Sequence, residues 1–357
     1  MGVDEARALC RDIILVPQKP NLYMRAHHAL VAEIGSVIPV DQVKSIDELC
    51  CKLDDGQRHD PHELAHRIKR AIRYNIGASV TCSIGFAANR QLAKIAGATQ
   101  KPDGLTVWNP SDMPGPLLKL PIDDIPGVGG RMKTRLAVAG IVTTEALLAT
   151  QPKQLRALWR NVTGERLWYA LHGYDIAAQS TKRSMYGHGR VLPPDARTLE
   201  AAREIARLLT IKAARRMRRD GWYCKAISLW VQFYGAKRNY SWGERTTLPI
   251  VRDDQAILKA FSGLWARMLD TVSSTAICAR LGVTLSELES AEARQLDWLT
   301  NDDAERQRWE RIGDAIDALN SRFGATVASI GPWKPPVGGN VGGKISFTRI
   351  PSPEDFV

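Results

Sequence analysis

Two hydrophobic spacings alternate along the first 115 residues, and together they restrict this part of the chain to a layered α/β domain. Apolar residues recur at every fourth position over 21–36 and 61–76, which predicts two amphipathic helices. Asp60 and Pro61 are typical residues for the N-cap and first position of the second helix. Residues 37–53 and 78–86 have strand-like patterns instead. A helix over 89–98 and a strand through Val107 complete the predicted mixed α/β sheet domain, which ends near residue 115.

The acidic pair Asp47 and Glu48 falls on or beside the first of these strands, in a chain with a formal net charge of +11. Such a basic chain favours a polyanion as partner, and adjacent carboxylates can hold the divalent ions that polyphosphate chemistry uses. The alternative is that both acids are solvated surface groups. Because neighbours on a regular strand face opposite ways, one metal cluster can use both acids only if the strand bends or ends there.

Residues 116–175 have a different pattern, in which short predicted helices are separated by glycines. The segment 122–141 is typical of a helix-hairpin-helix. Gly127 and Gly129 permit a tight turn whose backbone N–H groups can hold a nucleic-acid phosphate, with Arg131 and Lys133 beside them. A plain glycine turn between packed helices is the alternative.

The positive charge is concentrated after a connector over 176–186. Between residues 181 and 245, fifteen Lys and Arg stand against five Asp and Glu. The pattern over 187–330 predicts a second α/β domain with a largely antiparallel sheet, on which aromatic residues such as Trp230 alternate with basic ones. The candidate DNA contacts here are Arg215, Arg216, Arg218, Arg219, Lys237 and Arg238. The macrodipole of the helix over 199–219 explains part of this cluster without any ligand.

Membrane and secreted classes are not indicated. No run reaches the ~18 uninterrupted apolar residues of a membrane helix, and the N-terminus lacks the order of a signal peptide. We therefore expect a cytoplasmic protein. Its six cysteines have no Cys-x-x-Cys spacing, so neither a zinc site nor a disulfide framework is predicted. Residues 331–357 begin with a segment rich in Gly and Pro and are expected to be flexible.

Four motifs in order resemble the Y-family, or translesion, DNA polymerases, and within them the bacterial polymerase IV group. They are Ser45-Ile-Asp-Glu48, the stretch from Cys82 to Ala96, Lys101-Pro-Asp-Gly104 and Ile125-Pro-Gly-Val-Gly129. The resemblance implies an α+β multidomain fold. Its parts would be a remnant of the fingers (1–20), an incomplete palm with a mixed α/β sheet (21–115), a helix-hairpin-helix thumb (116–175), a linker (176–186), an α/β little-finger DNA-binding domain (187–330) and a tail (331–357).

The resemblance also implies an activity, namely error-prone template-directed DNA synthesis in DNA repair and damage tolerance, by nucleotidyl transfer through two Mg²⁺ ions. Asp47 resembles a metal ligand, Glu48 the neighbouring catalytic carboxylate, and Lys101 the lysine that contacts the triphosphate. Lys94 is a weaker candidate, because lysines on helix faces are commonly just solvated. The expected partners are primer-template DNA and deoxynucleoside triphosphates, with the sliding clamp as a further candidate, for a nucleoid-associated monomer without membrane contact.

The sequence departs from the family upstream of these motifs. Family members begin with a strand that carries another metal-binding aspartate, whereas Met1 to Cys10 resembles the closing helix of the fingers. Leu49 to Lys52 also differs from the family pattern. We therefore expect either a start further upstream or a truncated relative, with an impaired metal cluster and an unpaired strand position in the palm sheet.

Three hypotheses follow. The first is an error-tolerant polymerase, and the second is a catalytically silent Y-family relative that acts as a DNA-binding accessory factor in repair. The third is a helix-hairpin-helix protein with a different enzymatic domain, which leaves the acidic pair and the Lys101 motif unexplained.

Overall fold

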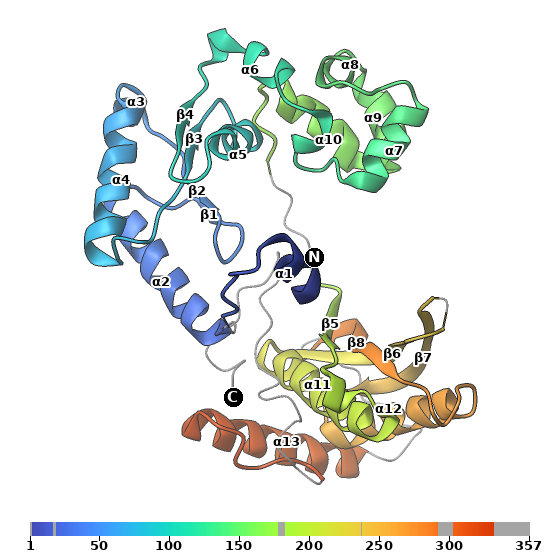
Figure 1. Cartoon of the computed structure of the whole chain (residues 1–357). Coiled ribbons are helices and arrows are strands. Elements are labelled where there is room, and N and C mark those ends of the chain that lie inside the picture. Colours follow the sequence, from blue (N-terminus) through green and yellow to red (C-terminus); the bar gives the residue numbers. More distant parts are fainter. Residues whose placement is uncertain (1, 17–18, 178–182, 237, 292–302, 332–357) are drawn as a thin grey trace. The chain divides into compact units, whose positions relative to one another are not determined.

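The computed structural model of the chain describes residues 2–16, 19–177, 183–236, 238–291 and 303–331 (Figure 1). Lys237 and the predicted tail after residue 331 lie outside the described residues. The chain divides into two compact units, of which the first is built on Leu22–Ser180 and the second on Thr181–Ile345 together with the first 21 residues. The division falls inside the connector predicted over 176–186. No described helix combines the length and the apolar character that a membrane crossing requires.

The first unit begins with alternating helices and short strands. In order these are α2 (Pro20–Val37), β1 (Gln42–Val43), β2 (Leu49–Cys50), α3 (Asp55–Arg58), α4 (Pro61–Asn75), β3 (Ile84–Phe86), α5 (Arg90–Thr99) and β4 (Leu105–Val107). The predicted start of α4 is confirmed, because the Asp60 side chain accepts a hydrogen bond from the Glu63 N–H at 2.9 Å and Pro61 is the first helical residue. The strand predicted over 78–86 is too long. Residues 77–80 form a turn, in which the Val80 N–H donates to the Gly77 carbonyl, and only Ile84–Phe86 pairs with a neighbour.

The strands of this unit form two separate two-stranded sheets. β1 and β2 pair antiparallel as a hairpin, and β3 and β4 pair parallel with Gly85 opposite Thr106. The core beneath them contains Ile38 and the predicted stripe of α4, namely Leu64, Ile68 and Ile72. Residues 37–53 therefore do contain strands, but as a short hairpin whose loop carries the two acids.

A helical part completes the first unit. Its elements are η1 (Pro110–Asp112), α6 (Gly115–Leu118), η2 (Ile122–Asp124), α7 (Gly130–Val138), α8 (Thr144–Leu148), α9 (Pro152–Trp159) and α10 (Val162–Leu171). The helix expected before the glycine turn is only the 3₁₀ turn η2, because Pro121 and Pro126 border it and proline disfavours helix in the residue before it. One buried cluster joins Leu92 and Ile95 of α5 to Leu136 and Leu155 of these helices. Residues 21–115 and 116–175 thus share a core.

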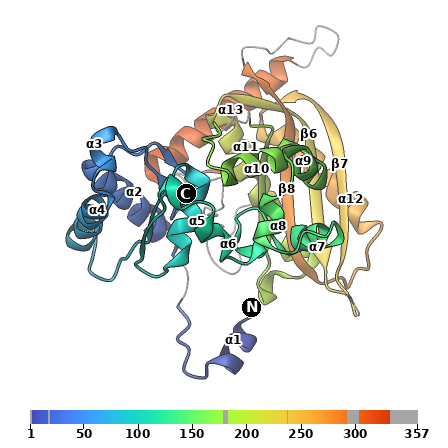
Figure 2. The ribbon, with the colours of Figure 1, turned by 90° about the horizontal axis from the view of Figure 1, so that it is seen from above.

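The second unit contains a four-stranded antiparallel sheet of order β5-β8-β6-β7, as its sequence pattern predicts. Its elements are α1 (Val3–Leu9), β5 (Met185–Val191), η3 (Pro194–Ala196), α11 (Leu199–Arg219), β6 (Trp222–Phe233), β7 (Tyr240–Val251), α12 (Asp254–Leu269), β8 (Cys278–Ser290) and α13 (Asp303–Phe323). Helices α11 and α12 cover one face of the sheet (Figures 1 and 2), where Leu209 and Phe261 meet Leu229 and Val283 in the core.

Arg218 holds three helices of this unit together. Its guanidinium makes two hydrogen bonds to Asp254 of α12, at 2.7 and 3.2 Å, and two to Asp317 of α13, at 2.8 and 3.1 Å. Burial alone would lower the pKa of Arg218, but the two carboxylates outweigh it and raise that pKa above its usual value. Because the Arg218 side chain is only 2% exposed, the expectation that it contacts DNA is wrong.

Replacing Arg218 by methionine should destabilise the second unit by about 3–5 kcal/mol, because the Asp254 carboxylate is left buried without a counter-ion. Urea unfolding measures this loss, and R219M is the matched control because the Arg219 side chain is 42% exposed and pairs with Asp220 near the surface. Burial without a counter-ion raises the folded-state pKa of Asp254 in R218M, so its stability should partly recover as the pH falls through that pKa. Equal stabilities of R218M and R219M would contradict this account.

Candidate functional site

Both acids lie in the loop of the β1–β2 hairpin rather than on a strand. The N–H groups of Lys44 and Ser45 donate to the Glu48 carbonyl at 2.8 and 3.0 Å, which closes the loop. The Ser45 hydroxyl donates to Asp47 Oδ1 at 2.5 Å. Asp47 is exposed and Glu48 is half-buried. The regular ladder ends before the two acids, as a shared role at one site requires.

Helix α2 fixes the position of this loop through His27. The ring is buried, with 6% of the residue exposed, and its Nδ1 lies 2.8 Å from the Ile46 carbonyl oxygen. Since a carbonyl oxygen only accepts, Nδ1 must carry the hydrogen. The residue between Ser45 and Asp47 is thereby attached to a helix of the same unit.

Helix α5 lies beside the loop and supplies cations. Lys94 Nζ lies 2.5 Å from Glu48 Oε2, so Lys94 is a partner of the acidic pair and not merely solvated. One turn earlier, Arg90 donates to Gln42 Oε1 at 3.1 Å, and Lys44 reaches the same oxygen at 2.5 Å. Two carboxylates therefore stand among three cations. Such a mixture can bind a polyphosphate together with a divalent ion.

The position of α5 is determined by a contact of its backbone with β3 and by the hydrogen bonds of its N-cap residue. A Cβ atom on Gly85 of β3 would lie 2.1 Å from the Ala93 carbonyl oxygen and 2.3 Å from the Gly97 nitrogen, so helix and strand touch through backbone atoms. The N-cap Asn89 accepts from the Leu92 N–H at 2.9 Å, and its amide nitrogen donates to the carbonyls of Ala170 and Tyr174 at 2.8 and 3.0 Å. Asn89 therefore links the α5 N-terminus to the end of α10.

Lys101 is exposed and follows the C-terminus of α5 by two residues. Its turn is attached to α4, because Lys69 forms an ion pair with Asp103 at 2.9 Å and also donates to the Asp103 carbonyl. Asp103 has a positive φ of 55°, and a Cβ on Gly104 would lie 1.8 Å from the Gln100 carbonyl oxygen. No signal in the sequence marks Lys69, which is a polar residue beside an apolar stripe.

The described residues contain no group of three or more His, Cys, Asp or Glu side chains that could hold a metal ion. Asp47 and Glu48 fit a divalent cation in ligand type, since carboxylate oxygens are the ligands that Mg²⁺ prefers. They supply only part of a ligand set, and Lys94 already neutralises Glu48.

The glycine turn before α7 is anchored by buried apolar residues. Ile125 and Val128 are 1% and 2% exposed, while Gly127, with φ of 108°, and the N-cap Gly129 are exposed. The backbone at the start of α7 therefore faces solvent, as phosphate binding requires. Arg131 is exposed too. Lys133 donates to Asp123 at 2.9 Å, and this hydrogen bond lowers the pKa of the Asp123 carboxyl.

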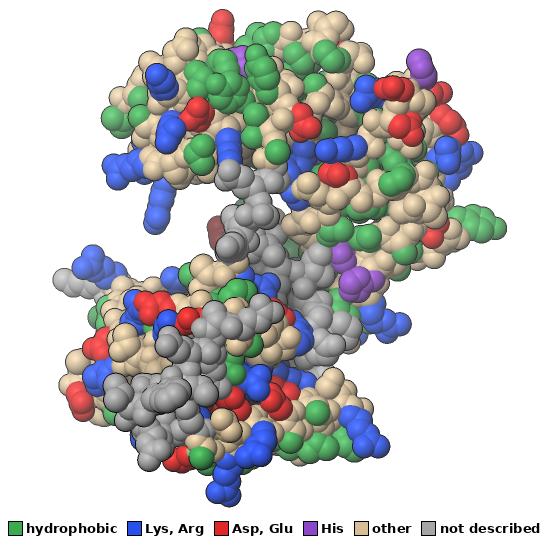
Figure 3. Space-filling view, turned by 180° about the vertical axis from the view of Figure 1, so that it is seen from behind, with side chains coloured by type: hydrophobic (Ala, Val, Ile, Leu, Met, Phe, Trp, Pro, Cys, Tyr) green, Lys and Arg blue, Asp and Glu red, His purple; other side chains and the backbone are tan. Residues whose placement is uncertain are grey.

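The remaining candidate DNA-binding cations of the second unit differ in how far they are exposed to solvent. Arg219 and Arg238 are exposed, whereas Arg215 and Arg216 are half-buried. Arg215 lies 3.7 Å from Asp317, and Arg216 donates to the Gly187 carbonyl at 3.1 Å. In the view of Figure 3, Lys and Arg side chains are spread over both units with acidic side chains among them.

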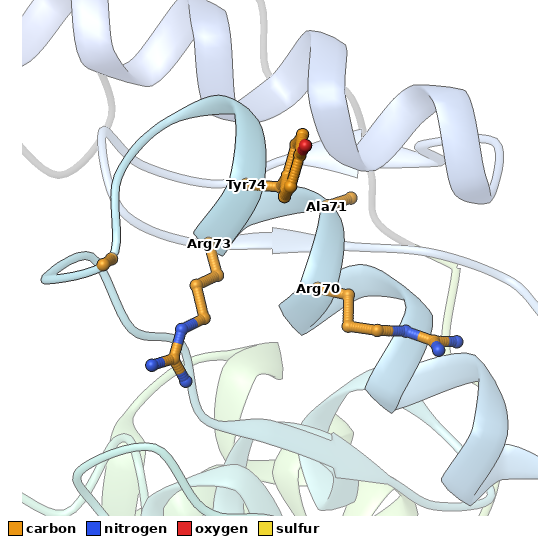
Figure 4. A pocket seen from close by; sticks show the side chains of 5 residues that line it. Arg70, Ala71, Arg73 and Tyr74 are labelled. Carbon is orange, nitrogen blue, oxygen red and sulfur yellow. The ribbon is translucent and has the colours of Figure 1, made fainter.

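An open pocket at the C-terminal end of α4 is separate from the candidate residues. Figure 4 shows its lining, which is Arg70, Ala71, Arg73, Tyr74 and Ala78. None of the sequence-predicted site residues lines it. The candidate site is therefore defined by the acidic loop and α5, and not by this pocket.

Comparisons with known proteins identify the family of the chain. The impB/mucB/samB family model matches residues 1–98, and the model of that family's C-terminal domain matches residues 183–298. A DNA polymerase IV of Moorella thermoacetica is 31% identical over 338 residues, which are 92% of this chain and 80% of the relative. A DNA polymerase IV of Methanoculleus marisnigri is 29% identical over 300 residues, covering 83% of this chain and 80% of the relative. A solved Y-family DNA polymerase chimera has a similar fold, with a TM-score of 0.64 and 22% identity over 80% of this chain and 82% of the other.

The chain therefore belongs to the Y-family of DNA-directed DNA polymerases. Within that family it is a relative of the DNA polymerase IV proteins.

Substituting Gly85 by alanine should destabilise the first unit by about 1–3 kcal/mol, because the added methyl must displace the backbone of α5. Thermal unfolding of G85A tests this. Gly115, whose Cβ would meet nothing within 4 Å, provides the control, and G115A should be unchanged or slightly more stable. A G85A chain as stable as G115A would show that α5 does not depend on the backbone contact.

Proposed function

We propose that the chain performs template-directed DNA synthesis of the translesion type, with its nucleotidyl-transfer site at the β1–β2 loop and α5. The main support for this proposal is the contact between Glu48 and Lys94. It places the acidic pair beside α5, and Lys101 follows the end of that helix by two residues. Carboxylates and cations on one surface match the chemistry of joining a primer hydroxyl to a nucleoside triphosphate.

Each residue has a distinct role in this proposal. Asp47 and Glu48 would hold Mg²⁺, which supplies charge neutralisation for the attacking and leaving oxygens when it is bound. Lys101 would contact the triphosphate, and Lys94 would exchange its bond to Glu48 for a phosphate oxygen as the charge of the site changes. Asn89 would hold α5 in place against α10.

Two surfaces would bind primer-template DNA. The turn from Gly127 to Gly129, with Arg131, would hold a phosphate at the N-terminus of α7. Arg215, Arg216, Arg219 and Arg238 would add backbone contacts from the second unit, and Lys133 would contribute after release from Asp123. The expected monomer and the sliding clamp as a partner stay predictions.

A second candidate function is a catalytically silent relative that binds DNA as an accessory factor. This alternative is favoured by the small number of carboxylates at the site, since no third carboxylate joins Asp47 and Glu48 within the described part of the chain. Under this alternative the DNA-binding surfaces keep their role. Nucleotide incorporation would be absent.

Primer extension separates the two functions. With Mg²⁺ and all four deoxynucleotides, the 357-residue chain should extend a primer slowly, because two carboxylates are too few for a complete two-metal site, and D47N and E48Q should each abolish this weak extension. No extension at any concentration of the chain would favour the accessory factor. The chain should nevertheless bind primer-template DNA, with an affinity that falls steeply as salt rises. Robust extension that is lost in D47N and E48Q would place the reaction here and refute the predicted impairment. Extension that survives both substitutions would place the reaction elsewhere.

The triple replacement R215A/R216A/R219A should weaken binding of duplex DNA similarly for different sequences. The slope of log affinity against log salt should flatten by up to about 0.9 for each phosphate contact that is lost. The matched control is R67A/R70A/R73A, which removes the same charge from the exposed face of α4. Equal slopes for the two triple variants would remove α11 from the DNA-binding surface.

A further inference from the structure

The four-stranded sheet of the second unit has an outer face, defined as the side chains that point away from α11 and α12. Ile227, Leu229 and Val231 of β6 are buried against those helices, so alternation places Ser228, Trp230 and Gln232 on the outer face. Trp230 is 38% exposed. It is therefore a large aromatic residue on the face of the sheet opposite the helices, and it is not part of the hydrophobic core.

Glycines occupy the row of the outer face that contains Trp230. The register places Gly243 of β7 and Gly282 of β8 opposite Trp230, and Gly189 of β5 opposite Gly282. The row therefore reads Gly189, Gly282, Trp230 and Gly243 across all four strands. The only side chain in it is the indole.

The indole lies on the backbone of β8. A Cβ on Gly282 would be 2.5 Å from the indole Nε1 and 2.8 Å from its Cζ2, which is closer than such atoms approach. A Cβ on Gly189 would be 3.5 Å from the same Cζ2. The ring thus extends from β6 over β8 toward β5 and fills the space of the absent side chains. This arrangement produces a low, flat apolar surface.

Side chains on the two adjacent rows of the outer face border the indole. Ser228 and Thr284, both short, lie on one of these rows, and Gln232 and Arg280 lie on the other. The Arg280 guanidinium lies 5.7 Å from the centroid of the Trp230 ring, within the range of a cation–π contact. No carboxylate of the described residues pairs with Arg280, whereas the nearby Arg245 pairs with Glu287. A flat π surface therefore lies beside a cation that is not neutralised within the described part of the chain.

We propose that Trp230 and Arg280 bind an unpaired nucleotide of single-stranded DNA, with the base stacked on the indole and its phosphate on the guanidinium. The inference rests on the proposed function only in taking DNA as the ligand. Paired bases in a duplex hide their faces against one another, so only an unpaired base can stack on the ring. The Arg280 side chain is exposed, so its guanidinium can move from the indole ring to the phosphate.

A purely structural role makes a different prediction. An aromatic ring that covers a cross-strand glycine can stabilise a sheet without binding anything. Under that reading, Trp230 substitutions would change stability and leave DNA binding unchanged. The two readings therefore differ in a single measurable quantity, the preference for single-stranded over duplex DNA.

The test compares the affinities of the full chain for fluorescent oligodeoxythymidine of about 12 nucleotides and for the matching duplex. W230A should bind the single strand about tenfold more weakly, as expected for loss of one stacked base, and the duplex with less than about twofold change. W230F should keep most of the affinity. R280Q should flatten the single-strand salt slope by about 0.7, the value for one phosphate.

Two further variants separate stacking from folding. G282A retains Trp230 but forces the indole off β8, so it should show the same selective loss as W230A. Y234A is the matched control, because Tyr234 is 42% exposed and is likewise covered by an arginine, Arg197 at 4.9 Å, but lies outside the glycine row. It should bind both DNAs as the wild type does.

The outcomes distinguish this inference from the proposed function. If the wild type binds the duplex but W230A, G282A and R280Q leave single-strand affinity unchanged, the inference fails and the proposed function stands. Equal losses on both DNAs would also overturn it. If the wild type binds neither DNA, both fail. Should W230A not fold, R280Q decides, since Arg280 is exposed and its replacement by glutamine is mild, and an unchanged single-strand salt slope would then overturn the inference.

Discussion

The close approach of α5 to Gly85 is the contact on which the candidate site depends. Only a glycine lets the helix backbone at Ala93 and Gly97 reach the strand. From that position one face of α5 contributes Leu92 and Ile95 to the core that continues into the helical part. The other face carries Arg90 and Lys94 to the hairpin loop. A single helix thus couples the acidic pair, the Lys101 turn and the end of α10.

The two units divide the chemistry between them. In the first unit, opposite charges lie close together on partly exposed side chains, where salt and ligands can change their pairing. In the second unit, an ionic cluster is buried around Arg218 and holds helices together, while the outer face of the sheet has a flat ring and a guanidinium that no carboxylate of the described residues pairs with. Arginine side chains of the second unit therefore differ in role according to their burial, as Arg218 and Arg280 show.

Local signals in the sequence predicted the elements well and the contacts between them poorly. The bounds of α11 and the Asp60 cap follow from periodicity and capping chemistry, which are local. The two acids were recognised because they are adjacent. The contact of Lys94 has no local signal because its partner lies 46 positions away, and the burial of Arg218 has none because its acids lie 36 and 99 positions away. The strand expected over 78–86 was too long because alternation indicates a face but cannot supply a pairing partner.

The central claim is that the hairpin loop and α5 form one metal-dependent nucleotide site. Paramagnetic broadening by Mn²⁺, added with a deoxynucleoside triphosphate to isotope-labelled chain, tests it most directly. The account predicts that the amide signals of Asp47 and Glu48 broaden first, followed by those around Lys94, and that excess Mg²⁺ restores them. Broadening centred elsewhere in the chain, with these signals unchanged, would contradict the account.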